Sequence, residues 1–165
     1  MFNFKGVLQA SLTSTVIGVA LVLLIALLMI VGHFLGPTEE GRIVGLITLA
    51  ISVLLMPVYF LLYLWTGYRG KKRFGLRTRE AGLSTAVAYG IAGFVYLVLS
   101  AILSILKVGD ALRYQLSPEM VGLPPVLGDE LWVVSTTFCA LGGLAIGVIL
   151  NFVIGMCGAI ISESR

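Results

Sequence analysis

The chain has 165 residues, of which 59% are hydrophobic and 12% are charged, with a formal net charge of +3. Soluble domains carry roughly 25% charged residues, so too few polar side chains are present to cover a water-soluble globule. This composition excludes an ordinary soluble domain. It predicts an all-α, polytopic membrane protein with a single membrane domain over residues 1–165.

The first apolar run covers residues 12–35 and contains no charged side chain. As a helix, about 20 such residues cross a hydrocarbon core of roughly 30 Å. The run exceeds the roughly 7–15 apolar residues of a cleaved signal peptide, which favours an uncleaved anchor. Hydroxyl side chains near its start are expected to bond carbonyls of their own helix and to need no partner. They are Ser11, Thr13, Ser14 and Thr15.

A compact turn precedes the second apolar run, which covers residues 43–66. Thr38 is the expected N-cap of this helix, and the two glutamates that follow it suit the positive end of the helix dipole. Pro57 lies inside the run. We expect it to remove one backbone donor and to kink the helix.

A short glycine-containing segment, residues 67–80, is predicted to be a basic loop. Between two apolar runs, such a cluster indicates a cytoplasmic loop rather than a nucleic-acid site. The role of these cations in setting the orientation of the chain in the membrane is enough to explain the cluster. Binding of anionic lipid headgroups or of an acidic partner is an open alternative. Its six cations are Arg69, Lys71, Lys72, Arg73, Arg77 and Arg79.

Two further runs follow, a third span over residues 81–106 and a fourth over residues 131–161. The connection between them, residues 107–130, is predicted to be a longer extracytoplasmic loop. The prediction is therefore a four-transmembrane-helix bundle with short loops elsewhere.

The orientation follows from the positive-inside rule, which puts both termini and the basic loop in the cytoplasm of a cell-membrane protein. Aromatic residues agree with this orientation. Tyr63, Trp65 and Tyr68 are expected to form an inner interfacial belt, and Trp132 is expected to mark the outer interface.

The fourth span carries a strip of small or polar residues at intervals of four. Gly143 and Gly147 form a GxxxG pair, which lets a second helix approach closely, and Asn151 is expected to bond across to that helix. The strip predicts a helix-packing interface, either with another span of this chain or with another subunit; a substrate or ion path is a third option. Its members are Cys139, Gly143, Gly147, Asn151, Gly155 and Ala159. The third span is a candidate mate, which would make the third and fourth helices a close pair. Its small residues are Ser84, Ala88 and Ala92, with Gly82, Ala86, Gly90 and Gly93 at neighbouring positions.

The four spans contain no Asp, Glu, Lys or Arg, although proton relays and ion-coupled transporters generally need ionisable groups at membrane depth. The chain also lacks HExxH, CxxC, GxSxG and Walker motifs. These observations predict a protein that is not an enzyme and has no cofactor or metal. Cys139 and Cys157, about 27 Å apart along a helix, are expected to be buried thiols that do not pair.

The leading hypothesis is a non-catalytic subunit that packs through small-residue helix faces into a larger membrane complex. One alternative is a small homo-oligomeric channel or passive transporter, with a path along Asn151, Thr48, Ser52 and the serines of the third span. A further alternative is a haem or redox subunit that uses His33, the only histidine. The predicted partners are the lipid bilayer and membrane subunits or a second copy of the chain, with no nucleic acid.

Overall fold

The computed structural model describes residues 2–36, 38–106, 108 and 125–164. Within these ranges the regular elements are four long α-helices, with no strand. Each contains a stretch long and apolar enough to cross a membrane, which confirms the all-helical prediction and indicates a membrane location. The helices are α1 (Phe4–Leu35), α2 (Glu39–Phe74), α3 (Thr78–Ile105) and α5 (Pro125–Glu163).

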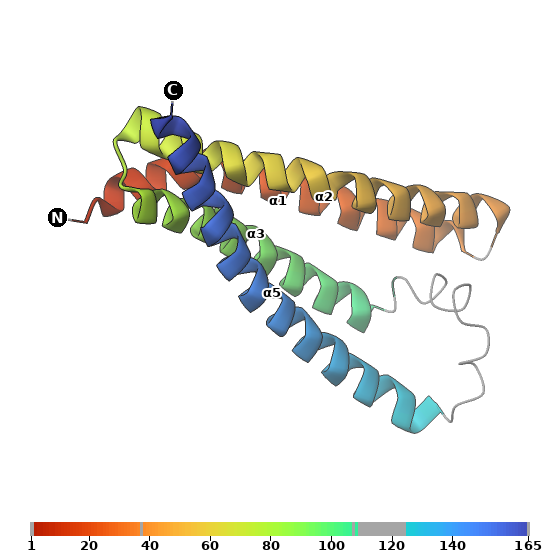
Figure 1. The fold of residues 1–165 in the computed structure, drawn as a ribbon. Coiled ribbons are helices and arrows are strands. Elements are labelled where there is room, and N and C mark those ends of the chain that lie inside the picture. Colours follow the sequence, from red (N-terminus) through yellow and green to blue (C-terminus); the bar gives the residue numbers. More distant parts are fainter. Residues whose placement is uncertain (1, 37, 107, 109–124, 165) are drawn as a thin grey trace.

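The helices form two antiparallel pairs, α1 with α2 and α3 with α5 (Figure 1). Both termini and the α2–α3 turn lie at one end of the molecule, which we call the basic end because it carries residues 69–79. The two pairs meet at the basic end and diverge toward the opposite end (Figure 1). The contact between α3 and α5 is the most extensive, and α2 also packs against α5.

The connection between α1 and α2 has the expected cap. Gly36 adopts a left-handed φ of 65°, which glycine tolerates without steric cost. Thr38 then caps α2, and its hydroxyl accepts a hydrogen bond of 3.2 Å from the Gly41 N–H. The prediction for Thr38 is confirmed.

The predicted basic loop over residues 67–80 is wrong for most of its length. Helix α2 continues to Phe74 and α3 begins at Thr78, so only residues 75–77 connect them. Gly75 ends α2 in the left-handed conformation with φ 62°, the usual helix C-terminal role of glycine. The next residue, Leu76, is fully buried among Val7, Ala10, Ala81 and Ala159, and this small core closes the basic end.

Helix α5 begins earlier than predicted, at Pro125 instead of residue 131. Proline suits a first helical turn because the N–H it lacks would have no intrahelical acceptor there. Most of the predicted outer loop, and the side chain of Trp132, lie outside the described residues. Pro57 lies inside α2, as expected from the sequence.

The outer surface of the bundle is apolar along most of its length. Large side chains such as Leu54, Met56 and Ile149 are exposed in the isolated chain. Buried positions concentrate toward the basic end, where the helices converge. The described chain therefore has an apolar exterior suited to lipid or to other apolar helices.

Candidate functional site

The small-residue strip of α5 divides into two parts. Gly147, Asn151, Gly155 and Ala159 are buried within the chain, whereas Cys139 and Gly143 are exposed. We call the first four residues the inner strip and the other two the outer strip. The GxxxG pair thus spans the boundary, and only Gly147 of that pair is used in packing between described helices.

The inner strip packs against α3 at close range. A Cβ atom added at Gly147 would overlap the ring of Tyr89, and one at Gly155 would overlap the side chain of Thr85. The Thr85 hydroxyl also lies 2.6 Å from the backbone oxygen of Asn151. The side-chain amide nitrogen of Asn151 donates to the Gly147 carbonyl of its own helix, at 2.8 Å. The observed bond to α3 at this position uses the backbone of Asn151 instead of its amide nitrogen.

The extensive α3–α5 contact agrees with the predicted close pair of the third and fourth spans, but Ser84 and Ala92 of the predicted row face other helices. A Cβ atom added at Gly18 of α1 would lie 3.1 Å from the Ala92 Cβ atom. One added at Gly70 of α2 would lie 3.6 Å from the Ser84 hydroxyl oxygen. The α3 residues that meet α5 lie on the neighbouring face and include larger side chains. They are Gly82, Thr85, Tyr89 and Gly93. A row of small residues indicates close packing, but it does not identify which face of the neighbouring helix packs there.

The closest backbone approach joins α2 to α5. A Cβ atom added at Gly67 would overlap the backbone of Gly155, and one at Gly158 would overlap the carbonyl of Leu64. The sequence predicts a loop at Gly67, and Gly158 lies beside the predicted strip and not within it, so this crossing was not predicted. The available signal was the recurrence of Gly67 and Gly70 at a helical interval of three.

Two hydroxyls of α1 have partners on α2, contrary to expectation. Ser14 is hydrogen-bonded to Thr66, and both side chains are buried. Thr13 accepts a hydrogen bond of 2.9 Å from the Arg69 guanidinium. Ser11 and Thr15 do bond carbonyls of their own helix, as predicted. These contacts join α1 to α2 with polar groups that would otherwise be costly to bury.

Tyr63 does not belong to an interfacial belt. Its side chain is 1% exposed and lies between helices. Its ring stacks on Tyr59 with centroids 6.2 Å apart and meets the Tyr89 ring edge-on at 5.7 Å. Trp65 is exposed near the basic end, as the belt requires. Tyr63 instead connects α2 to α3 and, through Tyr89, to the glycine at position 147.

The six basic side chains do not form one patch. Four of them belong to α2 and have partners there or on an adjacent helix. Arg69 contacts Thr13 of α1 and the Trp65 ring, and Lys71 pairs with Glu163 of α5. Lys72 donates to the Tyr68 hydroxyl, and Arg73 lies over the Phe74 ring. Arg77 and Arg79 line a cavity at the start of α3. The structure thus separates two cations from the rest.

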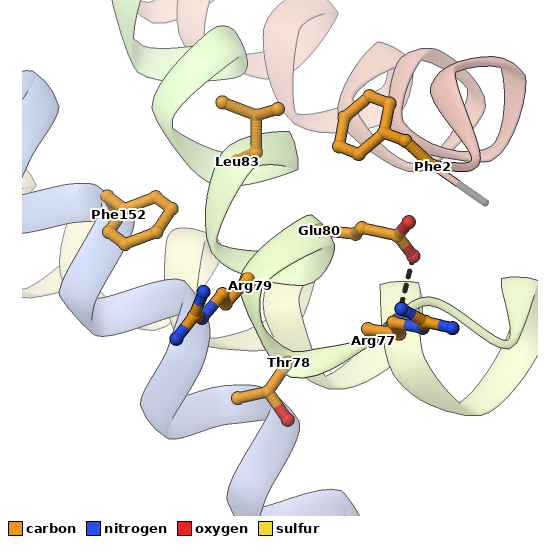
Figure 2. A pocket seen from close by; sticks show the side chains of 7 residues that line it. All are labelled: Phe2, Arg77, Thr78, Arg79, Glu80, Leu83 and Phe152. Atoms are coloured by element: carbon orange, nitrogen blue, oxygen red, sulfur yellow. Dashed lines mark hydrogen bonds between the residues drawn. The ribbon is translucent and has the colours of Figure 1, made fainter.

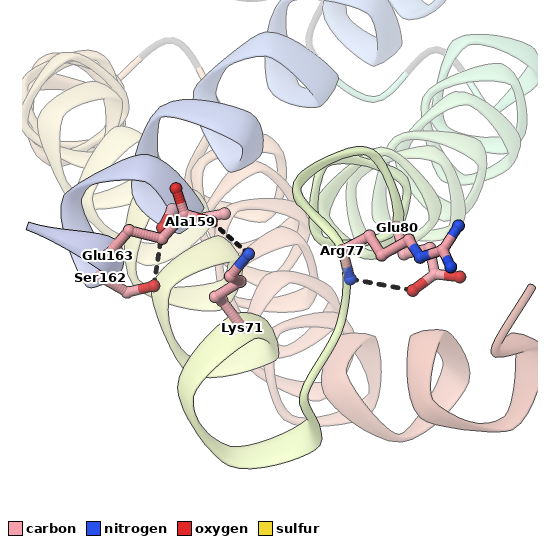
Figure 3. Close-up of polar contacts among 6 residues, drawn as sticks. All are labelled: Lys71, Arg77, Glu80, Ala159, Ser162 and Glu163. Atoms are coloured by element: carbon pink, nitrogen blue, oxygen red, sulfur yellow. Dashed lines mark hydrogen bonds and ion pairs between the residues drawn. The ribbon is translucent and has the colours of Figure 1, made fainter.

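Glu80 connects the starts of two helices at this cavity. One carboxylate oxygen accepts from the backbone N–H of Asn3, and the other accepts from the backbone N–H of Arg77, each at 2.9 Å. Asn3 itself caps α1 by accepting from the Gly6 N–H. Figure 3 shows the Arg77–Glu80 bond together with the Lys71–Glu163 ion pair, which joins α2 to α5. Polar contacts therefore tie together all four helices at the basic end.

The residues proposed for other functions lie apart. Thr48 and Ser52 each donate to a carbonyl one turn earlier in α2. The ring of His33 contacts Phe34 edge-on, with centroids 6.0 Å apart, near the end of α1. Among the described residues, no three His, Cys, Asp or Glu side chains lie close enough together to hold a metal ion. Cys139 and Cys157 are free, and both are exposed instead of buried.

Comparisons with protein-family models, curated proteins and solved structures find no match for this chain.

Proposed function

We propose that the chain is a non-catalytic membrane subunit that packs through the outer strip of α5 into a larger membrane assembly. Its basic end faces the cytoplasm in this proposal, because cationic segments are retained on that side. The partner is an apolar membrane helix, supplied by another protein or by a second copy of this chain.

The observation that carries the proposal is the open surface at Gly143. A Cβ atom at this glycine would meet no described atom within 4 Å, whereas one at Gly147, a single turn away, would overlap Tyr89. Glycine costs helix stability relative to alanine in a helix interior. An exposed glycine that contacts none of the described residues, such as Gly143, is therefore best explained by a contact with a partner helix.

Helix association within lipid gives the physical reason. Lipid tails are as apolar as leucine, so helices associate through close van der Waals contact, which small residues permit. The two helix pairs diverge toward the end where the outer strip lies (Figure 1). This divergence leaves α5 accessible to another helix in that region.

Gly143→Leu tests the proposal. The added Cβ atom would meet no described atom, so the fold should be retained, while a partner helix would be pushed away. We expect about a tenfold loss of assembled protein, since overpacking costs roughly 1–3 kcal/mol and 1.4 kcal/mol is a factor of ten. The measurement is native mass spectrometry of protein released from membranes in mild detergent.

Ala145→Leu is the matched control. Ala145 is also exposed on α5, but it lies two positions along the helix and therefore faces a different direction. This variant should assemble like the parent. Equal assembly of both variants and the parent, or a parent that is entirely monomeric at 17.6 kDa, would refute the proposal.

A further inference from the structure

A cavity of about 690 Å³ opens at the basic end beside the start of α3. This volume falls within the roughly 300–1,000 Å³ typical of ligand pockets. Phe2, Leu83 and Phe152 contribute its apolar side chains, from the N-terminal segment, α3 and α5 respectively. Arg77, Thr78, Arg79 and Glu80 contribute its polar part, as Figure 2 shows.

We propose that this cavity binds one anionic phospholipid from the leaflet that faces the basic end. The phosphate lies at Arg77 and Arg79, and the upper part of an acyl chain lies against the apolar side chains. This inference does not depend on the proposed function, because the cavity is formed by the chain alone.

Charge complementarity favours an anion at the polar part of the cavity. Arg77 and Arg79 bring two positive charges against one negative charge from Glu80. That carboxylate already accepts hydrogen bonds from two backbone N–H groups, those of Asn3 and Arg77. The first N–H groups of α3 have no intrahelical acceptor and add positive potential at the same place. Thr78 also lines the cavity and carries a hydroxyl group that can donate a hydrogen bond.

The apolar part of the cavity identifies the anion as a lipid. A soluble phosphate would leave the Phe2, Leu83 and Phe152 side chains without an apolar partner. Leu83 lies three residues beyond Glu80, where α3 enters its apolar stretch, so the cavity runs from a charged surface into the apolar region. A phospholipid has the same sequence of groups, a phosphate followed by hydrocarbon.

The test compares the double variant Arg77→Gln plus Arg79→Gln with a matched control, Lys72→Gln plus Arg73→Gln. Both variants lose two positive charges from the same segment, but the control residues do not line the cavity. Each protein is equilibrated with dioleoyl phosphatidylglycerol, or with dioleoyl phosphatidylcholine, in detergent micelles. Native mass spectrometry then counts the retained lipids.

We expect the parent to retain one phosphatidylglycerol in preference to phosphatidylcholine. The cavity variant should bind it about 30-fold more weakly, which corresponds to two cations at about 1 kcal/mol each near a membrane surface. The control variant should bind like the parent. An equal loss in both variants would show that the segment attracts anions only by its net charge, and this would overturn the proposal.

Two further measurements separate a lipid from a free anion and from misfolding. Leu83→Asn should weaken phosphatidylglycerol retention, whereas inorganic phosphate should compete only weakly with the lipid. Effective competition by phosphate would overturn the assignment to a lipid. If the cavity variant fails to fold, the parent still decides the question, because equal retention of the two lipids by the parent rules out the site.

Discussion

Gly67→Leu is expected to destabilise the fold by at least about 3 kcal/mol, the upper end of the usual cost of overpacking. A Cβ atom at this position would overlap the backbone of Gly155. Backbone atoms cannot rotate away as a flexible side chain can, so α2 and α5 would have to separate. The measurement is unfolding by sodium dodecyl sulfate in mixed micelles, followed by tryptophan fluorescence.

Gly142→Leu is the control for this substitution, because it adds the same side chain to a glycine whose Cβ direction is open. Its stability should match that of the parent. Gly67→Ala provides a smaller change at the crossing and should give an intermediate loss, which keeps the test usable if the leucine variant does not fold. Equal stability of Gly67→Leu and Gly142→Leu would contradict the close α2–α5 crossing.

Tyr63→Ala is expected to cost about 3 kcal/mol, the lower end of the range for truncating a buried aromatic side chain. Tyr63 is 1% exposed and packs against the rings of Tyr59 and Tyr89, so its removal leaves a cavity between α2 and α3. We use the lower end of this range because lipid is as apolar as the protein interior. The substitution therefore loses packing contacts but little hydrophobic transfer free energy.

The control for Tyr63→Ala is Phe60→Ala, an aromatic truncation on the exposed side of the same helix. Its effect should stay within about 0.5 kcal/mol, as for surface substitutions in general. The same unfolding measurement serves both variants. A similar loss for the two would mean that Tyr63 faces lipid, as the interfacial-belt hypothesis required.

Local sequence features predicted the helices well because each local signal acts within a few residues. A run of about 20 apolar residues needs a helix to satisfy its backbone in lipid. Thr38 caps its own helix by bonding an N–H three residues away. Neither feature depends on which other helix lies nearby.

Glycines were the main source of error because their role depends on the surroundings. Gly67, Gly70 and Gly75 lie close together in the sequence, and all were assigned to one loop. Only Gly75 has the left-handed conformation that ends a helix. Gly67 and Gly70 remain helical and permit contacts with α5 and α3. Apart from the interval of three between Gly67 and Gly70, no local pattern separates these two uses of the same residue.

The sequence by itself determined four apolar helices, their connection at Thr38, and the presence of a close-packing strip on the last helix. Only the tertiary structure decided that the strip is buried from Gly147 to Ala159 and open at Gly143. It also separated Arg77 and Arg79 from the other cations and placed them at a cavity. The physical reason is that helix formation depends on neighbours along the chain, whereas burial and cavities depend on how the helices converge and diverge.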